Sequence, residues 1–558
     1  MQNYYNTNQL SLSLKTDFIP EENHEARFID YLVESIEYQK LYITGRPREY
    51  DSRALLKLVL FSYLRGSYSC RQIERIAKEN IYARWLTQEL VPSYRTIARF
   101  IISDETDNLI LSSFDQMRTF LKQNNLIDDA VFIDGTKILA NANKYSFVWR
   151  KNIERYDELN QLKAQELIKE IKTAQQAGTE SLLPIECDDL DVVIALLEQR
   201  IDELDKQVEE TKKISPNPAK KVRRKAKSYL HKSKQIRNKE IEYNASKEIF
   251  GDRNSYSKTD HDATFMRVKE DPMNNGQLKP GYNLQIATSN QFVLDYDLYW
   301  NPTDTRTLIP FVQRLDKHQT LGKYIVADAG YGSESNYRYL NDYLPDQVPL
   351  IPYGTMLKEN SKKWKSDDRK VMNWDYYDQD DYYIDPNGVR FNFYRYVEQT
   401  DQYGFKRQFK KYRAETTDIE DRPINSALTP KGYVRYIQVN PEWEYFKAKE
   451  KEQLSEETNS SIYARRKIDV ESCFGHLKAY LRFNRFTVRG QEKVHKQMGL
   501  ALMAMNMGKL AKTMVPKRRI LTNKEDQDRK NPILVLYFDG VMSQPLLWLN
   551  IFFNYVQA

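Results

Sequence analysis

The spacing of apolar positions predicts a helical N-terminal region. Residues 54–66 (ALLKLVLFSYLRG) place apolar side chains at helical intervals and end on a glycine. A second helix is expected from Ser69, a good N-cap residue, and a third over residues 91–101 (VPSYRTIARFI). Three short helices, the last presenting Arg95 and Arg99, are typical of a helix-turn-helix element that binds DNA. A small helical bundle without that role explains the spacing equally well.

From residue 130 the pattern changes to the alternation that is typical of strands. AVFIDGTKILANA predicts a strand with Asp134 at its centre. Further strands are expected at ATFMRVK, GYNLQIATS and FVLDYDLYW, followed by a helix over TRTLIPFVQRLDKH and the strand YIVADAGY, which ends on Asp328. A short helix (SNYRYLNDYL) and another strand (VPLIPY) come next. This order predicts an α/β sheet flanked by helices.

Two insertions interrupt this order. The first is helical and charged, and five of its apolar residues step 3, 4, 3, 4 as in a heptad seam: Ile194, Leu197, Ile201, Leu204 and Val208. The second is rich in Tyr and Asp and contains a DPNG turn, which predicts β-hairpins. A final helical region begins near Ser461, and its amphipathic stretch EKVHKQMGLALMAMNMGKLAK is expected to close the core.

A chain of 558 residues exceeds what one hydrophobic core normally serves, so several units are expected. The changes of pattern divide it into a helical DNA-binding domain (1–125), the first part of a core (126–150), a helical, basic insertion (151–255), the continued core (256–355), a β-rich insertion (356–455), C-terminal core helices (456–512) and a tail (513–558). The apolar LLWLNIFF of the tail is expected to dock on the core or on a second subunit.

The composition excludes some classes of protein. Hydrophobic residues make up 41% and charged residues 29%, as in a globular and heavily charged chain rather than a disordered or membrane one. The first twenty residues lack the apolar stretch of a secretory signal. Only three cysteines occur, far apart, which favours a reduced, cytoplasmic setting without disulfides or zinc.

The distribution of charge indicates a nucleic-acid contact more strongly than the net charge of +7 does. Residues 211–239 contain twelve Lys and Arg residues and no acid, a density that suits the neutralisation of phosphates. The cations expected to contact DNA there include Lys220, Lys221, Arg223, Arg224, Lys225 and Lys227. The alternative is a solvated basic helix that balances the acidic stretch before it.

Two carboxylates stand in otherwise apolar strands. Asp134 lies in VFIDGTKI and Asp328 at the end of IVADAG, and burying such acids is costly without a partner or a metal. A two-metal phosphoryl-transfer site needs carboxylates from separate chain segments that converge on two cations roughly 3.5–4 Å apart. Magnesium and manganese prefer such oxygen ligands. The alternative for each acid is a cap on a loop or a bond to backbone amides.

A third acid lies in a predicted helix. Glu471 is followed by Gly475, Lys478 and Arg482 at steps of 4, 3 and 4, which places all four on one face. That face could hold a metal at one end and DNA phosphates along the rest. Asp469 lies roughly 200° round the helix from Glu471 and is expected to point elsewhere. A charged surface helix is the alternative.

The chain resembles the DDE transposases of bacterial insertion sequences, specifically the IS1182-like group, from about residue 40 to about residue 512. The resemblance is carried by four blocks: GRPREYDSRALLKLVLFSYLRGSYSCRQIE, FIDGTKILANANKYSFVWRK, ADAGYGSESNY and RRKIDVESCFGHLKAYLRFNRFTVRGQEKV. It implies a mixed sheet of the ribonuclease H-like fold. It also implies that Asp134, Asp328 and Glu471 are the catalytic acids and hold two Mg²⁺ or Mn²⁺ ions.

The resemblance further implies the partners and the reaction. The substrate would be double-stranded DNA: the enzyme binds terminal inverted repeats, cleaves at the element ends and joins the 3′-hydroxyl ends to target DNA. A homodimer in the synaptic complex and a bacterial cytoplasmic location, at the nucleoid when DNA is bound, would go with it. Relatives often carry a cysteine cluster in the β-rich insertion, and this chain has none there, so a structural zinc is not expected.

The resemblance also assigns roles to basic residues. Lys478 follows Glu471 after six residues, as in the signature of related transposases, whereas Tyr463, Arg465 and Arg466 are off register by about a residue. Arg466 is nevertheless expected to contact DNA. Separately from the resemblance, Lys144, Trp149 and Arg150 are candidates for contact with a strand end or a flipped base. Packing of Trp149 into the helical insertion is the alternative.

Three alternative hypotheses explain part of these observations. A nuclease or resolvase would share the fold and metals but lack strand transfer, and only a transposase joins a cleaved 3′-hydroxyl to target DNA. A domesticated DNA-binding protein would lack catalysis, yet the three acids and Lys478 are intact. A helical interaction protein built on the first insertion does not explain the acids in the strands.

Overall fold

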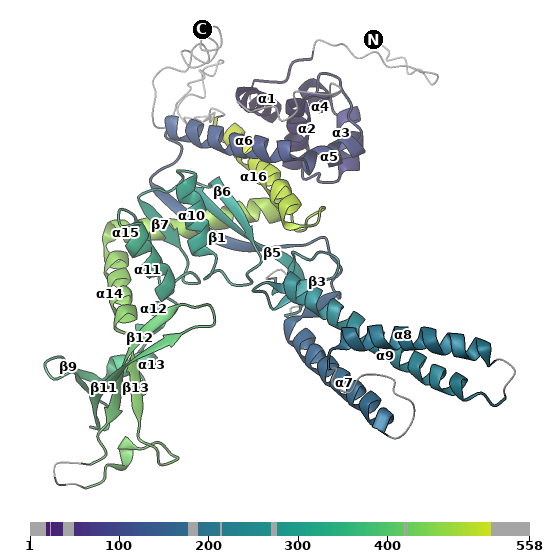
Figure 1. Cartoon of the computed structure of the whole chain (residues 1–558). Helices are drawn as coiled ribbons and strands as arrows, with labels where there is room; N and C mark the ends of the chain where they lie inside the picture. Colours follow the sequence, from purple (N-terminus) through teal and green to yellow (C-terminus); the bar gives the residue numbers. More distant parts are fainter. Residues whose placement is uncertain are drawn as a thin grey trace, which may run out of the picture.

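The computed structural model of the chain describes residues 18–22, 24–36, 50–176, 188–211, 215–268, 276–417, 420 and 422–514. Figure 1 shows a helical N-terminal region, a central sheet with helices against it, and two projections that leave the central sheet in different directions. The predicted tail (513–558) lies almost wholly outside the described residues. Within the described part of the chain, no helix is long and apolar enough to cross a bilayer.

Six helices form the N-terminal region: α1 (Glu25–Ser35), α2 (Ser52–Leu64), α3 (Cys70–Glu79), α4 (Ile81–Leu86), α5 (Tyr94–Ile101) and α6 (Asp104–Gln123). Ser93 caps α5 by accepting from the Thr96 amide, and Asn80 caps α4 in the same way. The pattern of apolar residues did not reveal α4, which has six residues, too few for a helical period to show. Helices α3 and α5 pack against each other, with Arg95 and Arg99 of α5 exposed.

The central sheet is built from β1 (Ala130–Leu139), β4 (Thr264–Arg267), β5 (Leu278–Ser289), β6 (Phe292–Tyr299), β7 (Tyr324–Ala327) and β8 (Val348–Leu350). Its order is β4-β5-β1-β7-β8, with β6 also paired to β5. β1 is antiparallel to β5 and parallel to β7, and β7 is parallel to β8. Helix α10 (Leu308–Lys317) lies between β6 and β7 in the chain, and helix α11 (Glu334–Tyr343) connects the parallel strands β7 and β8. This mixed α/β sheet confirms the predicted ribonuclease H-like fold class.

Helix α16 (Gln491–Met514) joins the N-terminal region to the sheet. It packs against α1, α2 and α6 on the helical side and against β6 on the other. Its side chains are therefore buried on almost every side between Lys496 and Ala511. The stretch closes the core as predicted, but it is a central helix and not an amphipathic one.

The first projection is a helical arm made of α7 (Arg150–Gln176), α8 (Leu190–Glu210) and α9 (Pro218–Phe250). Strands β2 (Phe147–Trp149) and β3 (Ser255–Ser257) pair at its base. The heptad seam lies on α8 and packs on α7 and α9. At its first position the buried residue is Val193, whereas the predicted Ile194 is only partly buried. Since α9 has 33 residues, the arm reaches roughly 50 Å from base to tip.

The second projection is the β-rich insertion, whose sheet has the antiparallel order β13-β12-β11-β10-β9. Its strands are β9 (Asp375–Tyr377), β10 (Tyr382–Ile384), β11 (Arg390–Thr400), β12 (Lys406–Ala414) and β13 (Tyr436–Val439), and the short helices α12 (Met356–Glu359) and α13 (Lys362–Lys365) precede them. The predicted hairpins are confirmed, and the DPNG turn closes with Gly388 at φ +78°. Helix α14 (Pro441–Ser455) falls inside the predicted insertion but packs on β8 and α11 of the core.

Helix α15 (Glu457–Gly475) packs across β1, β5 and β7. The predicted helical face from Glu471 to Arg482 is wrong at its far end. The α-helix stops at Gly475 and a π-helical turn, His476–Tyr480, follows it. Arg482 lies beyond that turn with φ +59°, outside any helix. A π turn adds a residue to the helical repeat, so α-helical steps no longer describe where later side chains lie.

Candidate active site

The pairing of β1 with β7 brings Asp134 beside Asp328. The parallel register runs from Ala130 opposite Tyr324 to Ile133 opposite Ala327. The next position of each strand is an aspartate, and partners in register point to the same face of a sheet. Two acids from segments almost 200 residues apart are therefore neighbours at the carboxyl end of β7.

The electrostatics of Asp134 reflect this neighbour. Its pKa is raised from 3.8 to about 6, first by burial and then by the negative charge of Asp328. Two contacts oppose the rise: the Gly135 amide donates to Oδ1 at 2.7 Å, and Arg466 lies 3.4 Å from Oδ2. A half-buried carboxylate beside a second one favours protonation or an added cation.

The loop after β7 holds Asp328 in place. The Gly330 amide donates to Asp328 Oδ1 at 2.8 Å, and Thr305 Oγ1 donates to the Gly330 carbonyl at 2.8 Å. A Cβ on Gly330 would come within 2.9 Å of Asp328 Oδ1. A side chain at position 330 would displace the Asp328 carboxylate from this hydrogen bond, so the geometry favours glycine in the sequence ADAG.

Helix α15 places a cation over this pair. Arg466 contacts Asp134 and also lies over the Tyr463 ring, 5.9 Å from its centroid. Its side chain is only 18% exposed, so the predicted DNA contact has become, in this structure, a contact with a candidate catalytic acid. Arg465 points the other way, to Asp128 at 2.6 Å, and holds α15 to the start of β1.

Glu471 lies on the same helix but is not brought to the pair. Its side chain is exposed, and it makes no hydrogen bond or ion pair with the described residues. It lies roughly 140° round α15 from Arg466, the residue that reaches Asp134. Asp469 does point elsewhere, as predicted: it is buried and accepts from Thr288 Oγ1 at 2.6 Å and from the Gln291 amide at 3.0 Å.

The acid pair fits a divalent cation by its chemistry. Both side chains offer carboxylate oxygens, the ligands that Mg²⁺ and Mn²⁺ prefer. Burial and the charge of Asp328 raise the pKa of Asp134, so a positive charge near the pair would stabilise its ionised form, and Arg466 supplies such a charge here. Within the described ranges, however, no three His, Cys, Asp or Glu side chains lie together closely enough to hold a metal ion.

One further acid near the pair was missed by sequence reasoning. Asp304 also raises the pKa of Asp134, and its Oδ1 accepts from Lys137 Nζ at 2.9 Å and from Asn283 at 2.8 Å. Asp304 contacts Lys137, and a Cβ added at Gly135 would also meet it. Residues 135 and 137 alternate with Asp134 along β1, so Asp304 lies on the opposite face of the strand. Nothing in NPTDTRT distinguishes this loop acid from a helix cap.

The predicted basic cluster lies at the far end of the arm. Lys220, Arg223, Arg224 and Lys227 line a hollow of about 310 Å³. Arg223 and Lys227 are paired with Asp205 of α8, at 3.1 and 3.3 Å. Lys220, Lys221 and Arg224 are exposed and form no ion pair with described residues. Part of the cluster balances α8, as the alternative held, and part is open to solvent.

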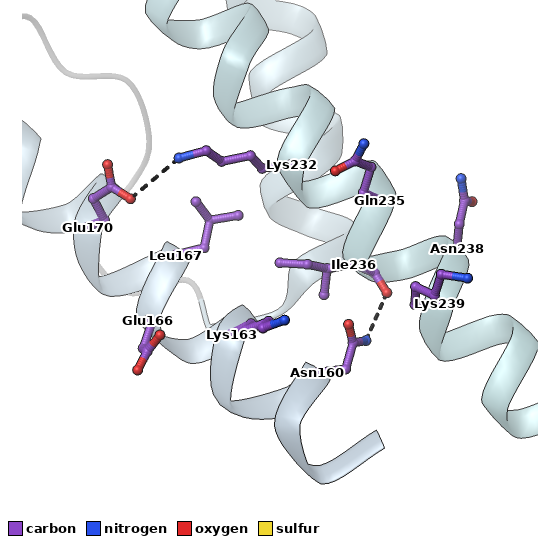
Figure 2. A pocket seen from close by; sticks show the side chains of 10 residues that line it. All are labelled: Asn160, Lys163, Glu166, Leu167, Glu170, Lys232, Gln235, Ile236, Asn238 and Lys239. Atoms are coloured by element: carbon purple, nitrogen blue, oxygen red, sulfur yellow. Dashed lines mark hydrogen bonds and ion pairs between the residues drawn. The ribbon is translucent and has the colours of Figure 1, made fainter. Parts of the chain in front are cut away.

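A second hollow, of about 640 Å³, separates α7 from α9 along the arm (Figure 2). Its polar lining includes Lys163, Lys232 and Lys239, and Lys232 lies 3.9 Å from Glu170. The Asn160 amide crosses from α7 to the Ile236 carbonyl at 2.9 Å. With acids and bases mixed along its walls, this hollow has no single charge preference.

The base of the arm contains the three residues proposed for a strand end. Trp149 is half-buried, with its ring centroid 6.3 Å from that of Phe265, so it packs on the core side of the arm. Arg150 Nε donates to the Arg253 carbonyl at 2.9 Å and thereby joins the two ends of the arm. Lys144 is exposed in the preceding turn. Trp149 and Arg150 therefore have structural contacts here, while Lys144 is open.

A ribonuclease H-like sheet that pairs an acid inside one strand with an acid at the end of the neighbouring strand is typical of enzymes that cut nucleic acid phosphodiesters. Residues 253–507 match the family described as Transposase DDE domain, and residues 14–102 match the Transposase domain (DUF772). The chain therefore carries two transposase domains, one of them a DDE domain, in the architecture of IS1182-family transposases. The DDE match includes Asp328 and Glu471 but begins after Asp134. No curated protein and no solved structure matches the chain.

Proposed function

We propose that this DNA transposase binds the terminal inverted repeats of its element, cleaves at the element ends and joins the 3′-hydroxyl ends to target DNA. The observation that carries the proposal is the pairing of Asp134 with Asp328 on a DDE transposase sheet. Proteins of this kind act on DNA with divalent metals. The alternative, a DNA-binding protein without catalysis, would not explain why a domain that matches the DDE family carries these acids.

Within this proposal Asp134 and Asp328 hold the cations, and Glu471 completes the set. The first two acids are supported by their register and by the raised pKa of Asp134. Glu471 is supported by the family resemblance and by its place on the helix that crosses β1 and β7. Two divalent cations bound by these acids would activate the attacking oxygen and stabilise the leaving oxygen.

Residues around the two acids would affect how the cations and the DNA bind. Arg466 neutralises Asp134 in the structure, so an incoming cation competes with a guanidinium for the same carboxylate. The Gly330 amide orients Asp328 and leaves its second oxygen available. Lys478 and Arg482, which follow α15, would contact phosphates of the bound DNA. Helices α3 and α5, as a helix-turn-helix element, would present Arg95 and Arg99 to the repeats.

We predict that Asp134→Asn, Asp328→Asn and Glu471→Gln each reduce cleavage of a plasmid that carries the inverted repeats by about 1,000-fold or more, equivalent to roughly 4 kcal/mol of barrier. Affinity for the repeats should stay within about twofold, because the proposal assigns recognition of the repeats to α3 and α5 and not to the acids. Glu457→Gln, an exposed glutamate on the same helix, is the matched control and should cleave normally.

The outcomes separate the parts of the proposal. Normal cleavage by Glu471→Gln, with both aspartate variants inactive, would keep the acid pair and remove Glu471. Normal cleavage by either aspartate variant would overturn the site. Cleavage by the wild-type chain without joining of the 3′-hydroxyl to target DNA would identify a nuclease instead of a transposase.

A further inference from the structure

One face of the sheet of the β-rich insertion carries a small hydrophobic core, and beyond that core the same face also exposes Tyr376, Phe393 and Tyr396. Tyr383, Phe391 and Tyr412 are packed on the inner face, in a small core of their own. The register places the alternate residues together on the opposite side, with Arg413 opposite Tyr436 and Arg395 opposite Lys411. We name this side the outer face; its aromatic and basic residues are Tyr377, Tyr382, Arg390, Tyr394, Arg395, Lys411, Arg413 and Tyr436, and Asp375 and Glu415 are its acids.

The outer face exposes large aromatic rings. Tyr377, Tyr394 and Tyr436 are 45%, 48% and 42% exposed, and they come from three different strands, β9, β11 and β13. The open side of an antiparallel sheet is normally polar. Exposed apolar and aromatic surface that is grouped in one place marks an interaction site.

Cations lie against these rings. The rings of Tyr377 and Tyr382 are stacked at 4.6 Å and 10°, and the Arg390 guanidinium lies 3.8 Å above the centre of Tyr382. On the far strands Lys411 Nζ lies 4.2 Å over Tyr436, and Arg395 lies beside Tyr394. The stack Tyr377–Tyr382–Arg390 spans three strands, so its geometry is fixed by the sheet.

The charge of the outer face is positive and partly unneutralised. Its four cations face two carboxylates, Asp375 and Glu415, and Arg390 lies 4.0 Å from Glu415. Arg395, Lys411 and Arg413 form no ion pair with residues that the structure describes. An acidic peptide or a phosphate chain would complement this charge, but the exposed rings add a second requirement.

Rings and cations together select unpaired nucleic acid. Aromatic side chains stack on the faces of bases while cations hold the backbone phosphates. A duplex hides the faces of its bases inside the helix and offers only phosphates and groove edges. We propose that the outer face binds an unpaired stretch of the DNA strand, through base stacking on Tyr377, Tyr394 and Tyr436.

The hairpin β11–β12 connects this face to the candidate active site. Arg407 of β12 bonds to Glu334, 3.1 Å away, at the start of α11 and six residues after Asp328. At the hairpin tip, Arg306 lies over the Tyr403 ring at 3.3 Å, next to the loop that holds Asp304. Strand ends released by cleavage could therefore reach the outer face. The inference rests on DNA as the substrate and not on the catalytic acids.

The test compares single-stranded and duplex binding by the full chain in the presence of a metal chelator, so that cleavage plays no part. The probes are a fluorescent 20-nucleotide oligo(dT) and a 20-base-pair duplex without repeat sequence, followed by anisotropy. Replacing Tyr377, Tyr394 and Tyr436 together by Ala should weaken binding of the single strand about tenfold or more, since stacking contributes to each base contact. Duplex binding should change less than about twofold.

Two matched variants define the mechanism. The same three tyrosines replaced by Phe should bind the single strand as the wild type does, because the ring stacks without its hydroxyl. Replacing Tyr145, Tyr343 and Tyr433 by Ala, three exposed tyrosines off the outer face, should have no effect. An unchanged affinity of the outer-face Ala variant, or an equal loss for duplex and single strand, would overturn the inference.

A charge variant covers the case in which the triple Ala variant does not fold. Arg395→Gln with Arg413→Gln should lower the salt slope for the single strand by about 1.4, the value expected for two phosphate contacts. An unchanged slope in a folded protein would contradict the inference. Because binding is measured without metal, failure here leaves the cleavage tests of the acid pair unaffected.

Discussion

Asp134 is an ionisable group in a position where its charged form is unfavourable. Burial and Asp328 raise its pKa to about 6, above the 3.8 expected for the unfolded chain. The folded state therefore holds more protons than the unfolded state between these two values, and stability falls as the pH rises through that window. Above pH 6 the full cost of the ionised pair is present. Such a cost is expected where a cation is to be bound later.

This cost gives a prediction at the residue scale. At pH 8 Asp134→Asn should increase the free energy of unfolding by about 3 kcal/mol, because the amide carries no charge to be buried. At pH 4 the gain should vanish, since the carboxyl is then protonated in the folded chain. Thermal unfolding without metal, followed at both pH values, measures the difference. A surface control, Asp316→Asn, should show no pH-dependent gain, and a gain of equal size at both pH values would contradict the electrostatic cause.

The site was predictable from the sequence to different degrees at different residues. Asp134 and Asp328 attract attention because lone acids are unusual in apolar strands, and the register then places them together. Asp304 gave no such signal, since acids in loops are common. The role of Glu471 stays a prediction: helical spacing gives its direction around α15, but only the packing of the helix decides how far it lies from the pair.

At the scale of elements, the turn between α2 and α3 attaches the N-terminal region to the catalytic region. Gly66 follows α2 with φ +69°, and a Cβ there would lie 3.1 Å from the Leu481 carbonyl oxygen. Tyr68 donates its hydroxyl to the same carbonyl at 2.8 Å and packs edge-on against Phe483. The segment just after the π-helical turn therefore packs against the turn between α2 and α3.

Gly66→Ala should destabilise the chain by about 1–2 kcal/mol, because the left-handed backbone and the close carbonyl both disfavour a Cβ. The loss should appear in denaturant unfolding as a lower midpoint. Gly404→Ala provides a control: it also has positive φ, +86°, but no atom lies within 4 Å of the added Cβ. Equal losses in the two variants would show that backbone strain alone accounts for the effect and that the contact with Leu481 adds nothing.

Elements of regular period were predicted well, and those that depend on tertiary packing were not. Strands β5 and β6 have apolar positions at period two, whereas β1 begins with a continuous apolar run and β7 consists of one, the pattern of a buried strand. The π turn after Gly475 has no local signature, and the burial of α16 on all sides depends on elements from both ends of the chain. The six-residue α4 is too short for its period to be detected.

At the scale of the whole molecule, the arm separates a basic tip from the catalytic sheet by roughly 40 Å, since about 27 helical residues lie between Arg223 and Phe250. That length corresponds to more than one turn of duplex DNA. We expect the tip to contact phosphates remote from the scissile bond, where it would increase affinity without entering the chemistry.

Replacing Lys220, Lys221 and Arg224 by Ala should reduce the salt slope of duplex binding by up to about 2.7, the value for three phosphate contacts, and weaken binding at physiological salt. The cleavage rate at saturating DNA should not change. Lys163, Lys232 and Lys239, which line the hollow nearer the core, form the charge-matched control and should have a smaller effect. Equal effects of both triple variants would indicate a general loss of positive charge and not a contact at the tip.

Because α15 crosses β1 and α16 is buried in the core, the core can be completed only after both of these C-terminal helices have been synthesised. Arg466 meets Asp134 across 332 residues, and α16 lies later still. At about 5–20 residues per second, the ribosome makes that intervening chain in some 15 to 70 s. Until then β1 lacks the helix that covers its acid, and the N-terminal helices lack α16. A truncated or stalled product would thus carry Asp134 and Asp328 without a completed core, and under the proposed function we expect such an unfinished chain not to cut DNA.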